Sequence, residues 1–268
     1  MNILRASAYV RALSGAFLFG LSSGGIVIAA DVSRASSDTV VVTASRLPES
    51  LDETLSSVTV IEREDIERLQ ARTLDELLAG VEGFALTRQG GVGQPTSVFL
   101  RGGESDHVLW LVDGVRIGSV TTGIPVVQDL PIDSIERIEI VRGPRSSLYG
   151  ADAMGGVVQI FTRRGSSAPS SLRVSGGSNG TTQVALSAGL GDATGWLDLQ
   201  ASHLRTDGVN ACLGRPFPPG GGCFTDEPDR DPYRNGSVNL RAGTRLGSHE
   251  LEAFVQRSEA RIAFDSSF

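Results

Sequence analysis

Residues 108–117 read Val-Leu-Trp-Leu-Val-Asp-Gly-Val-Arg-Ile, and residues 135–150 read Ile-Glu-Arg-Ile-Glu-Ile-Val-Arg-Gly-Pro-Arg-Ser-Ser-Leu-Tyr-Gly. The first run is apolar and of strand length, and its Asp113-Gly114 pair predicts a hairpin turn, because both central residues of a type I′ turn need a positive φ. Residues 137–141 alternate in polarity, which predicts a strand with one wet and one dry face. Gly143 and Pro144 then end that strand, because proline has no N–H and glycine permits a bend. This stretch therefore predicts short β-strands that are connected by glycine-containing turns.

The composition of the chain favours a turn-rich β protein and argues against nucleic-acid binding. Its 268 residues leave room for one or two domains, and 24 Lys+Arg against 31 Asp+Glu make it acidic. The 33 glycines and the 6% aromatic content suit short strands and turns. The glycine-rich residues 89–97 lack a Gly-Lys-[Ser/Thr] ending and precede a predicted strand, so no nucleotide site is predicted there. Without a nucleophile–base pair, a zinc motif or a cofactor loop, the chain is predicted not to be an enzyme.

The N-terminus predicts export. Residues 1–30 contain Arg5 and Arg11, then an uncharged stretch and small residues before Asp31, as in a signal peptide. The alternative, a membrane-spanning helix, is disfavoured by four glycines and three serines in this stretch. Residues 38–44, which are Asp38, Thr39, Val40, Val41, Val42, Thr43 and Ala44, form a short β-branched segment between polar flanks. Such a segment can add a strand to the edge of another protein's sheet, and the alternative is an edge strand of this protein's own fold.

The next segments predict a small α+β unit. Residues 57–61 read as a strand, and residues 64–70 as a short helix. Thr73 and Glu76 predict a capping box. Four apolar residues then follow at helical spacing, and Gly83 ends the run; they are Leu74, Leu77, Leu78 and Val81. Of these, Leu77 and Leu78 are predicted to be core residues.

The C-terminal third changes to long alternating strands. After a Gly/Ser/Pro linker at 165–171, five strands are predicted at residues 171–175, 182–190, 195–204, 237–246 and 250–258. Their period of two places one face in lipid and the other in a polar lumen, as in outer-membrane barrels. Short connections at 191–193 and 247–249, and a long one at 206–234, fit the same class.

The long connection holds two further patterns. Cys212 and Cys223 are the only cysteines, and an even pair in an exported chain predicts a disulfide. A metal site would need more thiols or a nearby histidine. The acidic run at 225–231 has the hard oxygen ligands that suit calcium, although it lacks the EF-hand spacing, and a solvated acidic loop is the alternative.

Taken together, five motifs resemble the plug domain of TonB-dependent outer-membrane receptors and transporters, in that family's order and spacing. They are Leu-Arg-Gly at 100–102, Leu-Val-Asp-Gly-Val at 111–115, Ile-Glu-Ile-Val-Arg-Gly-Pro at 138–144, Ser-Leu-Tyr-Gly at 147–150 and Gly-Gly-Val-Val-Gln-Ile at 155–160. The resemblance implies an α+β plug followed by the first strands of an antiparallel transmembrane β-barrel. The expected boundaries are 1–30 for the signal peptide, 31–47 for the TonB box and linker, 48–165 for the plug and 166–268 for the first barrel strands. Because the family's barrel has roughly 22 strands, we expect an N-terminal fragment.

The resemblance also implies functional residues, most closely those of the cobalamin (vitamin B12) transporters. Residues 38–44 correspond to the TonB box, which pairs with the periplasmic coupling protein TonB, whereas residues 31–37 are too few for a signalling domain. The implied substrate contacts are Pro95, Ser97, Glu104, Thr122 and Gly123. The implied calcium ligands are Asn210, Asp226, Asp229 and Asp231. The expected function is active uptake of cobalamin across the outer membrane of a Gram-negative cell, with a ferric-siderophore receptor or a passive adhesion or structural protein as the alternatives.

Overall fold

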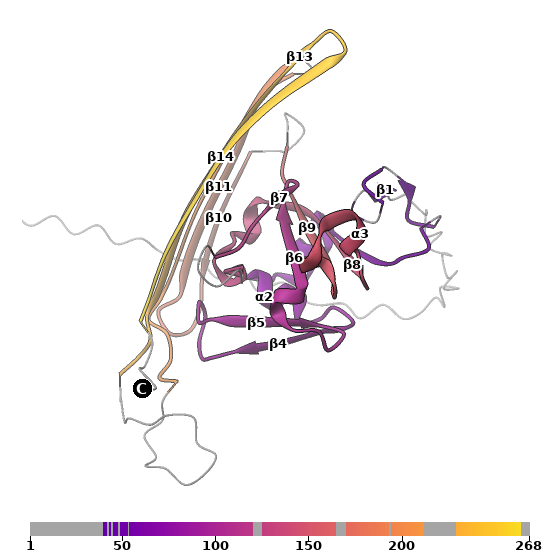
Figure 1. Cartoon of the computed structure of the whole chain (residues 1–268). Coiled ribbons are helices and arrows are strands. Elements are labelled where there is room, and N and C mark those ends of the chain that lie inside the picture. The colour runs from indigo at the N-terminus through magenta and orange to yellow at the C-terminus, as the bar shows by residue number, and fades with distance from the viewer. Residues whose placement is uncertain are drawn as a thin grey trace, which may run out of the picture. The chain divides into compact units, whose positions relative to one another are not determined.

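The computed structural model describes residues 40–41, 43, 45–47, 49–52, 54–119, 125–164, 170–192, 194–211 and 229–263, all of which lie in one compact unit (Figure 1). Residues up to 164 form an α+β part, and residues from 170 onwards form an antiparallel sheet. This order confirms the predicted fold class. The predicted signal peptide lies outside the described residues. Among the helices that are described, none has the length and apolar character needed to cross a membrane.

The α+β part is built on a mixed five-stranded sheet with the strand order β3-β8-β9-β6-β7. Its strands are β3 (Ser57–Glu62), β6 (Val108–Val112), β7 (Val115–Arg116), β8 (Ile135–Arg142) and β9 (Gly156–Thr162). β6 runs parallel to β9, and the other neighbours are antiparallel. Asp113 and Gly114 connect β6 to β7 with φ of 48° and 82°, which confirms the hairpin turn predicted for this pair.

Short elements surround this sheet. They are β1 (Val40–Val41), β2 (Glu49–Ser50), α1 (Arg63–Leu69), α2 (Leu74–Leu78), the hairpin β4 (Phe84–Arg88) and β5 (Thr96–Leu100), α3 (Ser146–Tyr149), and the 3-10 turns η1 (Ser105–His107), η2 (Val127–Asp129), η3 (Ile132–Ser134) and η4 (Ala151–Ala153). The predicted core residues Leu77 and Leu78 of α2 are buried, as is Leu74, and all three pack with the apolar face of the sheet.

Three local predictions are wrong. Thr73 caps α2 by position, but its buried hydroxyl has no partner among the described residues, and Glu76 instead accepts a hydrogen bond from the Arg72 amide at 3.0 Å. The helix ends at Leu78 rather than continuing to Gly83. The wet face predicted for β8 is also wrong, because Glu139 is fully buried. Thr43 lies over Glu139, and Tyr149 and Ala153 pack on the same face of the sheet.

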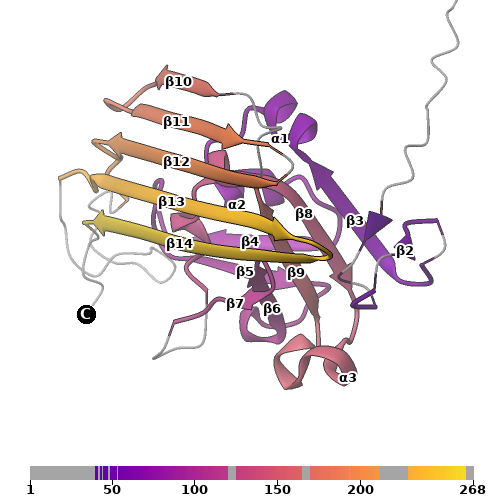
Figure 2. The ribbon, with the colours of Figure 1, turned by 90° about the horizontal axis from the view of Figure 1, so that it is seen from above.

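The C-terminal sheet consists of β10 (Ser171–Gly176), β11 (Thr182–Gly191), β12 (Gly195–Thr206), β13 (Tyr233–Leu246) and β14 (His249–Ile262), which lie side by side in sequence order (Figure 2). The predicted alternation is confirmed. Polar residues occupy the buried face toward the α+β part, including Gln183, Ser187, Asp198, Gln200, Asn235, Ser237, Asn239 and Arg241. Apolar residues occupy the exposed face, including Leu172, Val174, Val184, Leu186, Leu197, Leu199, Val238, Leu240 and Val255.

Candidate functional site

Thr43, within the predicted TonB box, is docked on the α+β part. Its amide and its hydroxyl both donate to Glu139 Oε2, at 2.9 and 2.7 Å, and its hydroxyl also lies 3.2 Å from Gln159 Oε1. Glu139 comes from the middle of β8 and Gln159 from β9. The other oxygen of Glu139 pairs with Arg137 at 2.9 Å. A buried carboxylate therefore holds a segment that lies 96 residues earlier in the chain.

Tyr149 secures the same segment from α3. Its hydroxyl donates to the Thr43 carbonyl oxygen at 3.0 Å, and the Arg46 guanidinium lies 4.4 Å above the centre of its ring. Burial raises the pKa of the Tyr149 phenol, which keeps the hydroxyl protonated as a donor. The backbone of Val40–Val41 pairs with Glu49–Ser50 of the same chain, so this part of the box is an internal strand in this structure.

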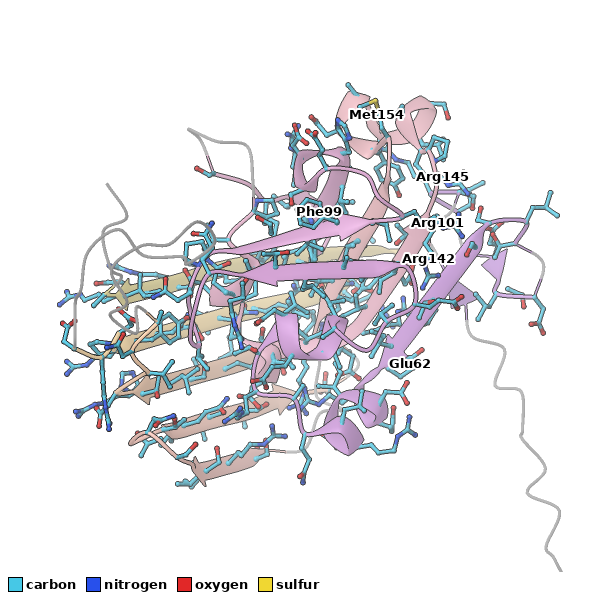
Figure 3. All side chains as sticks on the ribbon, turned by 90° about the horizontal axis from the view of Figure 1, so that it is seen from below. Glu62, Phe99, Arg101, Arg142, Arg145 and Met154 are labelled. Atoms are coloured by element: carbon cyan, nitrogen blue, oxygen red, sulfur yellow. The ribbon has the colours of Figure 1, made fainter. Side chains whose placement is uncertain are left out.

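The motif arginines gather next to the start of β3. Arg101, Arg142 and Arg145, labelled in Figure 3, come from the end of β5, the end of β8 and the turn that follows it. Arg101 donates to the Ser57 hydroxyl at 3.1 Å, and Arg145 donates to the hydroxyl of Ser56. Arg142 Nε donates to the Glu82 carbonyl oxygen at 2.9 Å. The contacts of Arg101 and Arg145 hold the chain at the start of β3, and the contact of Arg142 holds the chain just before β4.

The glycine-rich loop, residues 89–95, is clamped against β13. Gly93 has a φ of +85° and lies so close to the Tyr233 ring that an added Cβ would overlap it. Tyr233 is 1% exposed, and its hydroxyl donates to Asp129 Oδ1 at 2.7 Å. Gln94 also donates to the Ala263 carbonyl oxygen at 3.0 Å. The loop predicted to touch substrate is therefore fixed by the start of β13 and by the residue that follows β14.

Asp129 is the common partner at this end of the molecule. Its backbone oxygen accepts hydrogen bonds from Asn235 and Ser258, both at 3.0 Å. Burial raises the pKa of the Asp129 carboxyl, and the hydrogen bond from Tyr233 lowers it by less. The turn η2 is thus tied to both β13 and β14.

A buried ion pair anchors the α+β part to the C-terminal sheet near the middle of β13. Arg241 pairs with Asp113 and with Glu252, and Arg241 and Asp113 are 1% and 2% exposed. The Asp113 carboxylate also accepts hydrogen bonds from the Thr162 amide at 3.0 Å and the Thr162 hydroxyl at 2.6 Å. Removal of either charge would leave the other buried with fewer partners, which is costly.

Among the implied substrate residues that the structure describes, Glu104 lies apart from Pro95 and Ser97. Pro95 is exposed and Ser97 half-buried at the start of β5, whereas Glu104 follows the other end of that strand. There Glu104 lies near Asp106 and His107, with ligand atoms within 4.8 Å of one another. Thr122 and Gly123 lie outside the described residues, as do the other box residues Asp38, Thr39, Val42 and Ala44.

Two of the implied calcium ligands, Asn210 and Asp231, lie close together in the structure. Asp231 is 4% exposed, and its Oδ2 accepts a hydrogen bond from the Ala211 amide at 3.2 Å. The neighbouring Asn210 has a buried Oδ1 that accepts no hydrogen bond from any described residue. An orphaned buried oxygen beside a buried carboxylate fits the needs of a hard cation. Asp229 is exposed, and Asp226, Cys212 and Cys223 lie outside the described residues.

Comparison with known proteins identifies the α+β part. Residues 50–157 match the family model described as the TonB-dependent Receptor Plug Domain. The chain carries a TonB-dependent receptor plug domain. The matched residues contain β3 to β8, the start of β9 and all three α-helices described above. Members of this family are receptors and transporters of the Gram-negative outer membrane.

Three relatives illustrate the likeness. The vitamin B12 transporter BtuB of Photobacterium profundum is 36% identical over 248 residues, which cover 90% of this chain and 38% of that protein. BtuB of Vibrio cholerae is 48% identical over 126 residues, or 47% of this chain and 21% of that protein. A mutant of the ferric enterobactin receptor of Pseudomonas aeruginosa, solved with enterobactin, is 25% identical with a TM-score of 0.57, over 76% of this chain and 33% of its own. The chain thus spans well under half the length of these relatives.

Sequence reasoning missed the residues that hold the predicted sites in place. Glu139 and Tyr149 bind Thr43, and Tyr233 and Arg241 join the plug to the sheet. The inward parity of Arg241 was readable from the alternation of the strand predicted at 237–246. Tyr233 was predicted to lie in the long connection 206–234, which is wrong at its end because β13 begins at Tyr233. The partners of Tyr233 and Arg241 were not readable from the sequence, because those lie 104 and 128 residues away in the chain.

Proposed function

We propose that the full-length protein takes up a large, scarce solute across the outer membrane, with energy delivered by TonB to residues 38–44. The observation that carries this proposal is the docking of Thr43 on Glu139, Gln159 and Tyr149. A segment held at a defined place on the plug can transmit a pull to the plug's own sheet. A passive adhesion or structural protein would have no use for such an attachment.

The docking contacts suit a segment that must be released and recaptured. They are mainly hydrogen bonds, which contribute roughly 0.5–1.5 kcal/mol each between neutral groups and about 1.5–3 kcal/mol when one group is charged. Val40–Val41 adds a ladder of only two residues. A partner that offers a longer strand ladder to the same backbone would compete well with these contacts.

The test is Val41→Pro in a full-length version of the receptor. Proline removes a backbone N–H from the segment and should prevent strand addition by TonB. We expect solute binding to be retained and uptake by cells to be lost. Val41→Ala is the matched control, because it shortens the side chain and keeps the N–H. Unchanged uptake in the proline variant would refute the coupling role.

The proposed solute is cobalamin. The two BtuB relatives support this choice, and the likeness to the ferric enterobactin receptor supports a ferric siderophore as the alternative. Under this proposal Pro95, Ser97, Thr122 and Gly123 contact the solute, with Glu104 as a further contact. Equilibrium titration of the full-length receptor with cyanocobalamin and with ferric enterobactin distinguishes the two, since only one of them should bind with high affinity.

We further propose that calcium binds next to the solute through Asn210, Asp226, Asp229 and Asp231. The orphaned Asn210 oxygen and the buried Asp231 support this part of the proposal. The ion would fix the conformation of the long connection, and a Cys212–Cys223 disulfide would constrain the same connection. Isothermal titration that detects no calcium heat in the parent chain would remove the calcium site.

The remaining parts of the proposal concern location and chemistry. Residues 1–30 would direct export to the outer membrane as a cleaved signal peptide, and the exposed apolar face of β10–β14 would lie against lipid. The function is binding and transport without covalent chemistry, so no enzymatic activity is proposed.

A further inference from the structure

The exposed face of the C-terminal sheet changes character along its strands. On β13 the outward positions run from Arg234 through Val238 to Leu240, and on β14 they run from Arg261 through Arg257 to Val255. The register pairs Arg234 with Arg261 and Val238 with Arg257. The arginines therefore cluster at the strand ends next to the long connection, and the apolar residues lie farther along the same face.

The basic cluster consists of Arg234, Arg257, Arg261, His203 and Glu259, which line a shallow cleft of about 360 Å³ beside Gly236. Gly236 lies between His203 and Glu259 in the register, and its missing side chain leaves the cleft open. Three arginines against one carboxylate give the cluster an excess of two positive charges, with histidine counted as neutral.

The cluster is solvated and only partly neutralised within the chain. The side chains of Arg257 and Arg261 are 81% and 83% exposed, and both reach toward Glu259 at 3.2 and 3.3 Å. One carboxylate is thus shared by two guanidinium groups, and Arg234 has no salt-bridge partner among the described residues. Guanidinium groups in this arrangement suit the oxygens of a phosphate, which they can bind in a bidentate manner.

We propose that the basic cluster binds the headgroup of a phosphate-bearing anionic lipid, whose acyl chains lie along the neighbouring apolar face. This inference rests on the proposed placement of the sheet in a membrane. The choice of a lipid follows from continuity: Val238 lines the cleft itself, and Leu240, Leu199 and Val255 extend the apolar surface away from it. A free anion would use only the arginines, whereas a lipid would also cover this apolar surface.

The experiment measures lipid retention by native mass spectrometry on the full-length receptor in neutral detergent. The probes are dioleoyl phosphatidic acid and dioleoyl phosphatidylcholine, which share acyl chains and differ in headgroup, and inorganic phosphate is the third arm. We expect preferential binding of phosphatidic acid. An interfacial arginine contributes about fivefold in affinity, so Arg234→Gln/Arg257→Gln/Arg261→Gln should weaken phosphatidic acid binding on the order of a hundredfold.

Two further variants sharpen the test. Glu259→Gln removes the competing carboxylate and should tighten phosphatidic acid binding severalfold, which a merely structural role for the cluster does not predict. Arg68→Gln/Arg116→Gln/Arg245→Gln neutralises three exposed arginines elsewhere and should change binding less than twofold. Circular dichroism and thermal melting check that each variant folds.

The proposal is overturned if phosphatidic acid binds no better than phosphatidylcholine, if the triple cluster variant retains parental affinity, or if millimolar inorganic phosphate alone displaces the lipid. The last result would indicate an anion site without a lipid. The readout does not depend on the transported solute. A receptor that fails to bind cyanocobalamin would contradict the proposed substrate and leave the lipid comparison intact.

Discussion

Replacement of Glu139 by glutamine should loosen the docked N-terminal segment, and it also removes the charge that pairs with Arg137 on the same strand. Glutamine has nearly the same shape as glutamate and can still accept a hydrogen bond, but it lacks the charge. Glu139 Oε2 accepts two hydrogen bonds from Thr43, at 2.9 and 2.7 Å. The substitution therefore converts two charge-assisted bonds into neutral ones at a fully buried position.

The size of the effect follows from those two bonds. A hydrogen bond to a charged group contributes about 1.5–3 kcal/mol, and a neutral one about 0.5–1.5 kcal/mol. The expected loss is roughly 1 kcal/mol per bond, or about 2 kcal/mol for the pair. Because 1.4 kcal/mol corresponds to about a tenfold change in an equilibrium constant, the undocked fraction should rise roughly 30-fold.

The assay is hydrogen exchange of the Thr43 amide in the full-length receptor, since that N–H exchanges only when it leaves Glu139. Glu139→Gln should speed its exchange roughly 30-fold, by the argument above. Thr43→Val removes the hydroxyl bond, and its effect should not add fully to that of Glu139→Gln, because both act on one contact.

The control is Glu136→Gln on the same strand. Glu136 is 51% exposed and lies 3.7 Å from Arg163, so its loss should leave Thr43 exchange unchanged within about twofold. Exchange of Thr43 in Glu139→Gln that stays within about twofold of the parent chain would show that the carboxylate does not hold the segment, and the reasoning about docking would fall with it.

Three other predictions concern the contacts between the plug and the C-terminal sheet. Asp113→Asn keeps a residue type that tolerates the positive φ of the turn but removes a buried charge, so stability in detergent should fall by about 3 kcal/mol, as measured by chemical unfolding. Gly93→Ala should weaken solute binding at least tenfold, because the new Cβ would overlap the aromatic ring beside the loop; Gly102→Ala, also at positive φ but with nothing within 4 Å, should not. The raised pKa of Asp129 means that the folded state binds its proton more tightly than the unfolded state, so the associated stability is present at acid pH and lost as pH rises through the raised pKa; Asp129→Asn should flatten this part of a melting-temperature profile.

Local sequence patterns predicted the secondary-structure elements well and the contacts between distant segments poorly. The turn at Asp113-Gly114 and the alternation of β11 and β12 depend on neighbouring residues, and both are confirmed. The wet face predicted for β8 is wrong because Glu139 is covered by a segment 96 residues away. Periodicity reports which side a residue faces, but it carries no information about which distant segment covers that side.

The placement of β3 in the plug sheet has a mechanical consequence. β3 is an edge strand, bonded only to β8, and it is the first strand of this sheet to follow the docked segment. A load applied at Thr43 would reach Ser56 and Ser57, which Arg145 and Arg101 hold, and would then peel β3 from the sheet. β6 would stay attached to the C-terminal sheet, because Asp113 at its end pairs with Arg241 of β13. The plug would therefore open by the detachment of its edge strand β3, while the other strands of the sheet stay in place.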